Sequence, residues 1–120
     1  MTEKIRLTRR EEDILKVLWS SDEPLAAHAV SDRSDISMNT VQSVLRKLLK
    51  AGYIKAASIG YSGTVLTREY VATLTEEEYY ATVISSSALK GLVAHFINKD
   101  AKTSDLDDLQ RLIDQERAND

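Results

Sequence analysis

Cysteine is absent from this chain of 120 residues, and histidine occurs only twice. The lack of cysteine excludes disulfides, cysteine nucleophiles and zinc sites built from cysteine and histidine. No apolar run approaches the roughly 20 residues of a membrane-spanning helix, and no basic segment followed by an apolar one opens the chain. We therefore expect a cytoplasmic protein with no membrane insertion, no metal and no other cofactor.

Catalytic motifs are lacking as well. The sequence contains no recognisable pair of nucleophile and base, no glycine-rich phosphate loop and no catalytic carboxylate pair. The acidic residues Asp105, Asp107 and Asp108 lack the glycine and the spaced glutamate of a calcium loop, so they favour a helix start. A binding protein is therefore favoured over an enzyme.

The charge is divided unevenly along the chain, although the net charge is only −3. Residues 1–74 hold 11 Lys and Arg against 9 Asp and Glu, whereas residues 75–120 hold 5 against 10. Between Ser37 and Leu74 the only anion is Glu69, and the cations there are Arg46, Lys47, Lys50, Lys55 and Arg68. A modest basic patch is typical of a nucleic-acid interface, and the acidic C-terminal part is not.

An amphipathic helix with two distinct faces is predicted over Ser37–Gly52. Ser37 is placed to cap its start, and Gly52 is placed to end it in a left-handed conformation. Apolar residues at helical spacing form one face: Val41, Val44, Leu45, Leu48 and Leu49. The opposite face begins with short polar groups and ends with cations: Asn39, Gln42, Ser43, Arg46, Lys47 and Lys50.

The order of groups on this polar face suits a helix that reads the major groove. Asn and Gln can bond adenine edges and Arg can bond guanine edges, whereas lysines bond phosphates without reading sequence. A helix entering the groove by its N-terminal end needs the reading groups first. We predict base contacts from Asn39, Thr40, Gln42, Ser43 and Arg46. The alternative, for this helix alone, is an ordinary solvated face.

The segments before this helix predict a helix-turn-helix. A first helix is expected over Thr8–Ser20, with Thr8 and Glu11 as a capping box. Pro24 ends that stretch, and Leu25 can form a very short strand. A short helix over Ala26–Asp32 and a turn then deliver the chain into the reading helix.

A β-hairpin is predicted after Gly52. Tyr53–Ser58 and Thr64–Ala72 are rich in β-branched and aromatic residues, and Ile59–Gly63 between them is expected to be a loop. A hairpin in this place is the wing of a winged helix-turn-helix. We predict contacts with the DNA backbone from Ser37, Lys47, Lys50, Lys55 and Tyr61.

Helical periodicity returns from Thr75, where Thr75–Glu78 reads as a capped helix start, and Ser104 is expected to begin a last helix. These helices have too little chain around them to bury both sides, so a partner surface is expected, most simply a second copy. The alternative is that they fold back on the N-terminal part. The expected dimerisation residues are Leu89, Leu92, Val93, Phe96, Ile97, Leu106, Leu109, Leu112 and Ile113.

The predicted fold is mainly α with a small β-hairpin. Residues 1–74 are expected to form a winged helix-turn-helix DNA-binding domain, and residues 75–120 a helical dimerisation region. The competing interpretation is a winged-helix module that binds protein rather than DNA. A neutral or acidic reading face would favour that module, whereas the face here carries Arg46, Lys47 and Lys50.

Several segments, in this order and spacing, resemble the BlaI/MecI/CopY family of bacterial transcriptional repressors, from Leu7 to about Arg117. They include Thr8 with Glu12–Trp19, Thr40–Leu48, Gly52–Ile54, Tyr70 with Ala72, Thr75–Tyr79 and Leu89–Phe96. The resemblance implies a homodimer with interlocked C-terminal helices and two winged domains on an inverted-repeat operator of the TACA/TGTA type. Binding there would block transcription.

Three departures from the family pattern limit this resemblance. Ala56 and Ala57 stand in the wing where members often have further basic residues, which points to weak wing contact with phosphates. The cysteine pair of the copper-responsive members is absent, so copper sensing by that route is excluded. Members that respond to a membrane sensor protease are cut at an Asn-Phe bond. The similar position here is His95-Phe96, where Phe96 fits and His95 does not, so cleavage stays open.

Overall fold

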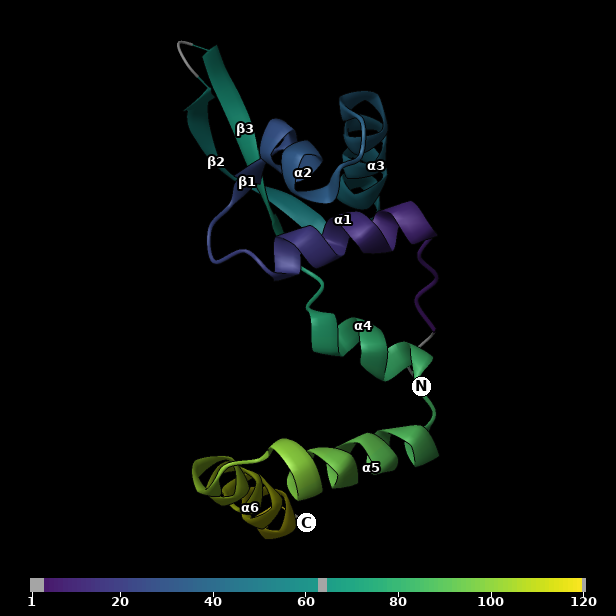
Figure 1. Ribbon diagram of the computed structural model, residues 1–120, viewed down its shortest axis with the longest axis vertical. Coiled ribbons are helices and arrows are strands. Elements are labelled where there is room, and N and C mark those ends of the chain that lie inside the picture. The colour runs from purple at the N-terminus through teal and green to yellow at the C-terminus, as the bar shows by residue number, and fades with distance from the viewer. Residues whose placement is uncertain (1–3, 63–64, 120) are drawn as a thin grey trace. The chain divides into compact units, whose positions relative to one another are not determined.

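The computed structural model describes residues 4–62 and 65–119, and the side chains at positions 58–66 lie outside what it describes. The chain folds as two compact units, Met1–Val83 and Ile84–Asp120. Figure 1 shows the elements of each unit.

Helix α1, Arg9–Trp19, begins with the predicted capping box. The Thr8 hydroxyl accepts from the Glu11 amide at 3.2 Å, and the Glu11 carboxylate accepts from the Thr8 amide at 2.9 Å. These reciprocal bonds satisfy amides that would otherwise have no partner at the helix start. The inner face of α1 buries Ile14, Leu15 and Leu18.

The predicted helix-turn-helix is present. Strand β1, Leu25–Ala26, leads into α2, Ala27–Ser34, and then into α3, Met38–Ala51. Asp35 turns the chain between the helices with a left-handed φ of 59°. Ser37 caps α3 by accepting from the Thr40 amide, and Gly52 ends it with a φ of 81°, as predicted.

The wing is larger than the sequence predicted. Strands β2, Ile54–Ser62, and β3, Val65–Ala72, pair antiparallel, and β1 pairs with the other edge of β3 to give the order β1-β3-β2. The expected loop at Ile59–Gly63 is therefore wrong: pairing continues to Ser62 opposite Val65, and positions 63 and 64 lie outside the described residues. Ladder hydrogen bonds along the partner strand outweigh the weak strand propensity of one glycine, Gly60.

One hydrophobic core joins the elements of the first unit. The apolar face of α3 is buried as predicted, except that Leu49 is only partly covered. The fully buried side chains are Ile14, Leu15, Val30, Val41, Leu45 and Leu48. Because α1, α2 and the sheet all pack against it, α3 is held with its polar face outward.

Helix α4, Glu76–Val83, packs on the first unit rather than standing with the later helices. The Tyr79 side chain is buried, and its ring stacks on that of Trp19 with centroids 6.0 Å apart. The Trp19 indole in turn donates to the Leu74 carbonyl at 2.8 Å. For this helix, the alternative of folding back onto the N-terminal part is the one realised. The units divide after Val83, beyond the predicted domain boundary at residue 74.

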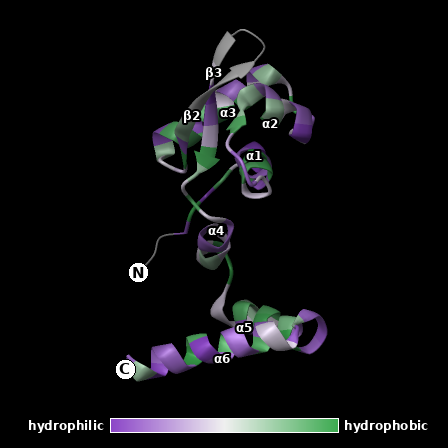
Figure 2. Cartoon of the chain, turned by 90° about the vertical axis from the view of Figure 1, so that its left-hand side faces the viewer, coloured by the Kyte–Doolittle hydropathy of each residue, from purple (hydrophilic) through white to green (hydrophobic). Residues whose placement is uncertain are grey.

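The second unit contains α5, Ser86–His95, a π-helical segment η1, Phe96–Asp100, and α6, Thr103–Ala118. The η1 segment is not predicted by the sequence; in it the Ala101 amide donates to the Phe96 carbonyl five residues earlier. Neither these two helices nor η1 contains a buried residue. Figure 2 shows hydrophobic residues along both α5 and α6.

Among the described helices, none combines the length and the apolar character needed to cross a membrane.

Candidate nucleic-acid interface

The outer face of α3 presents the predicted reading groups to solvent. Asn39, Gln42 and Arg46 are exposed, whereas Thr40 and Ser43 are half-buried. Thr40 is also engaged locally, because its hydroxyl oxygen accepts from the Ser37 hydroxyl at 3.1 Å. Of the predicted set, the three exposed side chains are therefore the freest to reach a ligand.

The side chains predicted to contact the DNA backbone lie on the same unit. Ser37, Lys47, Lys50 and Lys55 are exposed. Lys47 stands on α3, and Lys55 is on β2 immediately after the helix. The side chain of Tyr61 lies outside the described residues, so its predicted contact stays a prediction.

Two hollows flank α3, and their linings include residues for which the sequence predicted no role. One, of about 400 Å³, lies on the side of α1; its lining includes Asn39, Ser43 and Lys47 from α3 with Arg10 and Glu11 from α1. The sequence around Arg10 gives no signal of this position, because only the packing of α1 against α3 creates it.

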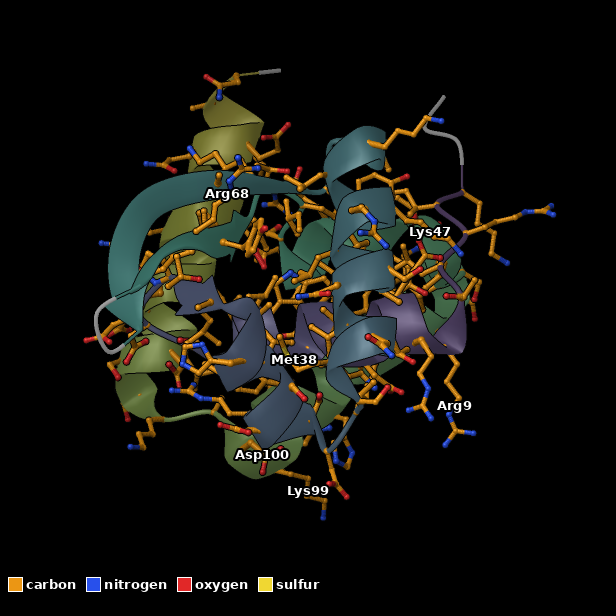
Figure 3. The ribbon with its side chains drawn as sticks, turned by 90° about the horizontal axis from the view of Figure 1, so that it is seen from above. Arg9, Met38, Lys47, Arg68, Lys99 and Asp100 are labelled. Atoms are coloured by element: carbon orange, nitrogen blue, oxygen red, sulfur yellow. The ribbon has the colours of Figure 1, made fainter. Side chains whose placement is uncertain are left out.

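The other hollow, of about 340 Å³, lies on the side of the sheet. Gln42 and Arg46 line it from α3, and Thr67, Arg68 and Tyr70 line it from β3. The sequence had placed Arg68 in the basic patch without a role. Figure 3 shows Arg68 on β3 to one side of α3 and Lys47 on the other.

A cluster of polar and aromatic side chains joins α1 to α4. Glu12 accepts from the Tyr79 hydroxyl at 3.3 Å and from the Tyr80 hydroxyl at 3.4 Å, and Lys16 pairs with it at 3.1 Å. Hydrogen bonding from Lys16 lowers the pKa of Glu12, and hydrogen bonding from Glu12 raises the pKa of Lys16. Burial raises the pKa of Tyr79. This cluster stabilises the unit that carries α3.

The predicted dimerisation residues are confined to the second unit and are uncovered there. Leu92 and Leu112 are 58% and 60% exposed, and Phe96 is 39% exposed. Of the predicted set only Leu109 is half-buried. His95 ends α5 and Phe96 begins η1, so the candidate cleavage position falls where the hydrogen-bonding pattern of the helix changes.

No group of three or more His, Asp or Glu side chains in the described part of the chain could hold a metal ion. The basic and hydrogen-bonding groups around α3 are instead suited to phosphates and base edges.

A model of the family described as penicillinase repressor matches residues 7–115. No curated protein matches significantly. Among solved structures, Staphylococcus aureus MarR in complex with salicylate and kanamycin has a TM-score of 0.51 at 14% identity, covering 92% of this chain and 71% of that chain. The multiple antibiotic-resistance repressor from Listeria monocytogenes 4b F2365 has a TM-score of 0.51 at 13% identity, covering 93% and 73%.

A further MarR family transcription regulator has a TM-score of 0.54 at 15% identity, covering 94% of this chain and 73% of that chain. At such identities the likeness establishes the fold alone. It confirms the predicted fold class, a mainly helical chain with a winged helix-turn-helix.

Proposed function

This chain belongs to the penicillinase repressor family and is therefore a DNA-binding transcriptional repressor, not an enzyme; we propose that it acts in the cytoplasm as a homodimer on an inverted-repeat operator, with α3 in the major groove. The observation that carries the proposal is the two-sided chemistry of α3. Its apolar face is buried in the core, and its outward face offers Asn39, Gln42 and Arg46.

Base reading by α3 follows from the reach and direction of these groups. The two amide side chains can each donate and accept toward an adenine edge, and the Arg46 guanidinium can donate twice to a guanine edge. Thr40 and Ser43 supply shorter contacts beside them. Lys47, Lys50, Lys55, Ser37 and Tyr61 contact phosphates, which fixes the position of α3 without adding sequence preference.

Self-association explains the uncovered apolar side chains of the second unit. Two helices and a π-helical segment without a buried residue cannot form a core by themselves, and exposed apolar patches of this kind mark interaction sites. A second copy of the chain offers the same apolar surface. In a dimer with a two-fold axis, each copy buries the exposed apolar side chains of the other. In this proposal the first unit, residues 1–83, binds DNA and the second unit, residues 84–120, holds the dimer.

An inverted repeat follows from the two-fold axis, because two identical reading helices meet the two strands in opposite directions. The TACA/TGTA form of the repeat is carried over from the family. Linking two half-site contacts in one dimer raises affinity far above that of either contact alone.

The experiment that tests the function is a binding-shift titration on the DNA upstream of the protein's own gene, with sedimentation of the free protein at micromolar concentration. We expect a dimer that shifts this fragment in preference to random DNA, and footprinting should outline two inverted half-sites. Equal affinity for random DNA would reject operator binding, and a monomer in sedimentation would reject the homodimer.

Release of the operator is proposed to follow from a cut at His95-Phe96 by a membrane sensor protease. Both residues are exposed, and the peptide bond joins the end of α5 to the start of η1. A cut there detaches α6 from α5 and divides the dimer surface. A foreign protease site placed at this bond tests the coupling: operator affinity should fall after complete cutting, and unchanged affinity would refute it.

A further inference from the structure

Among the described residues, the lining of the hollow between α3 and β3 contains two arginines and no acidic residue. Arg46 lines it from the helix and Arg68 from the strand, beside the hydroxyl-bearing Thr67. Both arginines are exposed, and within the described residues neither has an ion pair or a hydrogen bond by its side chain. Two positive charges lining one hollow attract an anionic ligand.

Phosphate is the anion that fits this set of donors. A guanidinium presents a planar fork of N–H groups that bonds two phosphate oxygens at once. Thr67 adds a hydroxyl donor beside Arg68.

The hollow on the opposite side of α3 has a different balance of positive and negative charge. Its lining includes the Glu11 carboxylate, and Arg10 there forms an ion pair with Asp13 at 3.7 Å. Its cations are thus partly compensated within the protein, whereas those of the hollow beside β3 are not. Of the two sides of α3, the side of the sheet is the stronger anion site.

We propose that the hollow between α3 and β3 seats one phosphate of the DNA backbone, with Arg68 as its principal ligand and Thr67 beside it. The proposal rests on the proposed function and adds a backbone contact from the body of β3. Arg68 pairs across the ladder with Ile59, away from the end of the hairpin where Ser62 faces Val65. The proposed Arg68 contact is thus separate from the end of the hairpin. It also does not depend on basic residues at positions 56 and 57, where this chain has Ala56 and Ala57.

The first test compares the intact wild-type chain with Arg68→Ala on operator and random DNA over a range of salt. Loss of one charged contact in each subunit should weaken binding of the dimer about 10- to 100-fold on both DNAs. The salt slope should fall by about 1.8, which is about 0.9 for the one phosphate in each of the two half-sites. Arg68→Lys should restore the slope and only part of the affinity, because the bidentate fork is lost.

Arg117→Ala is the matched control, because it removes the same charge from an exposed position of α6. It should leave the salt slope unchanged. An equal effect of both variants would mean that net charge, not the hollow, is responsible. Unchanged circular dichroism and Trp19 fluorescence should show that Arg68→Ala is folded.

The second test locates the phosphate. Neutral methylphosphonate linkages are placed one at a time through the footprinted site, and each fragment is titrated with both proteins. At one position in each half-site, the substitution should weaken wild-type binding and have no effect on Arg68→Ala, which is the coupling expected of direct partners. Coupling at no position would overturn the phosphate seat. A wild-type chain that binds no DNA would reject the proposed function itself, which separates the two failures.

Discussion

Gln42 is the side chain at which base reading can be separated most sharply from backbone binding. It is exposed on α3, and its amide can bond an adenine edge. Gln42→Ala should cost about 1 to 3 kcal/mol at the operator and leave binding to random DNA nearly intact.

Lys47→Ala is the matched comparison on the same helix, because a lysine bonds phosphate without reading sequence. It should weaken binding to every DNA and flatten the salt dependence. Fluorescence anisotropy titrations on both DNAs measure the two effects. An equal loss on operator and random DNA for Gln42→Ala would refute its assignment as a reading residue.

Glycine is required at position 52 because of the backbone conformation there, not because a larger side chain would lack room. Its φ is 81°, and a Cβ atom built there meets nothing within 4 Å. Gly52→Ala should therefore destabilise the first unit by about 1 to 2 kcal/mol, the cost of a left-handed conformation in an L-residue. Urea unfolding followed by Trp19, the single tryptophan of the chain, measures it. Gly91→Ala, within α5, is the control. It should leave the urea midpoint of the unfolding reported by Trp19 unchanged.

At the scale of elements, the contact between α1 and α4 depends on the charge of Glu12. Its carboxylate bonds Lys16, Tyr79 and Tyr80, and hydrogen bonding from Lys16 leads the causes that lower its pKa from the ordinary value of 4.5. A lowered pKa means that the folded state favours the ionised form. The stabilisation is therefore complete above pH 4.5 and is lost as the pH falls through the lower folded-state pKa.

Glu12→Gln tests this pH dependence, because glutamine keeps the shape of the side chain and removes the charge. At pH 7 the variant should unfold at a lower urea concentration than the wild type, as reported by Trp19. The difference should shrink as the pH is lowered below about 4.5. A difference that stays constant down to pH 3 would contradict the role of the Glu12 carboxylate.

At the scale of the whole molecule, the end point of a truncation decides whether the DNA-binding unit survives. The chain ending at Val83 keeps α4, with Tyr79 buried against Trp19. It should remain folded and bind DNA as a monomer, weakly and without half-site cooperation.

The chain ending at Leu74 lacks Tyr79, so it should be less stable by about 3 to 5 kcal/mol, the usual cost of deleting a buried aromatic side chain. Urea unfolding of the two fragments measures the difference. Equal stability of the two fragments would show that α4 contributes nothing to the first unit.

Phe96 tests the dimer, because it is exposed in the single chain and is proposed to be buried in the pair. Phe96→Ala should cost roughly 3 to 5 kcal/mol per buried ring, chiefly as lost dimer stability. Operator affinity should then fall although no DNA-contacting residue is changed. Sedimentation at several concentrations measures dimer dissociation. A variant that remains as tightly dimeric as the wild type would remove Phe96 from the interface.

Local signals in the sequence determined much of this fold. The capping box at Thr8, the cap at Ser37 and the left-handed Gly52 are each fixed by the chemistry of neighbouring residues, so the bounds of α1 and α3 followed within a residue or two. The apolar spacing of α3 likewise fixed its buried face and, by exclusion, the exposed face that carries Asn39, Gln42 and Arg46.

Tertiary structure alone decided what lies beside these elements. The length of the wing depends on pairing between β2 and β3, and the place of α4 depends on a stacking partner 60 residues earlier in the chain, Trp19 for Tyr79. The hollow lined by Arg46 and Arg68 exists because the packing of the first unit brings residues of α3 and β3 to its walls. Helical spacing and caps act between residues a few positions apart and can be found in the sequence, whereas packing joins distant residues and emerges only when the core has formed.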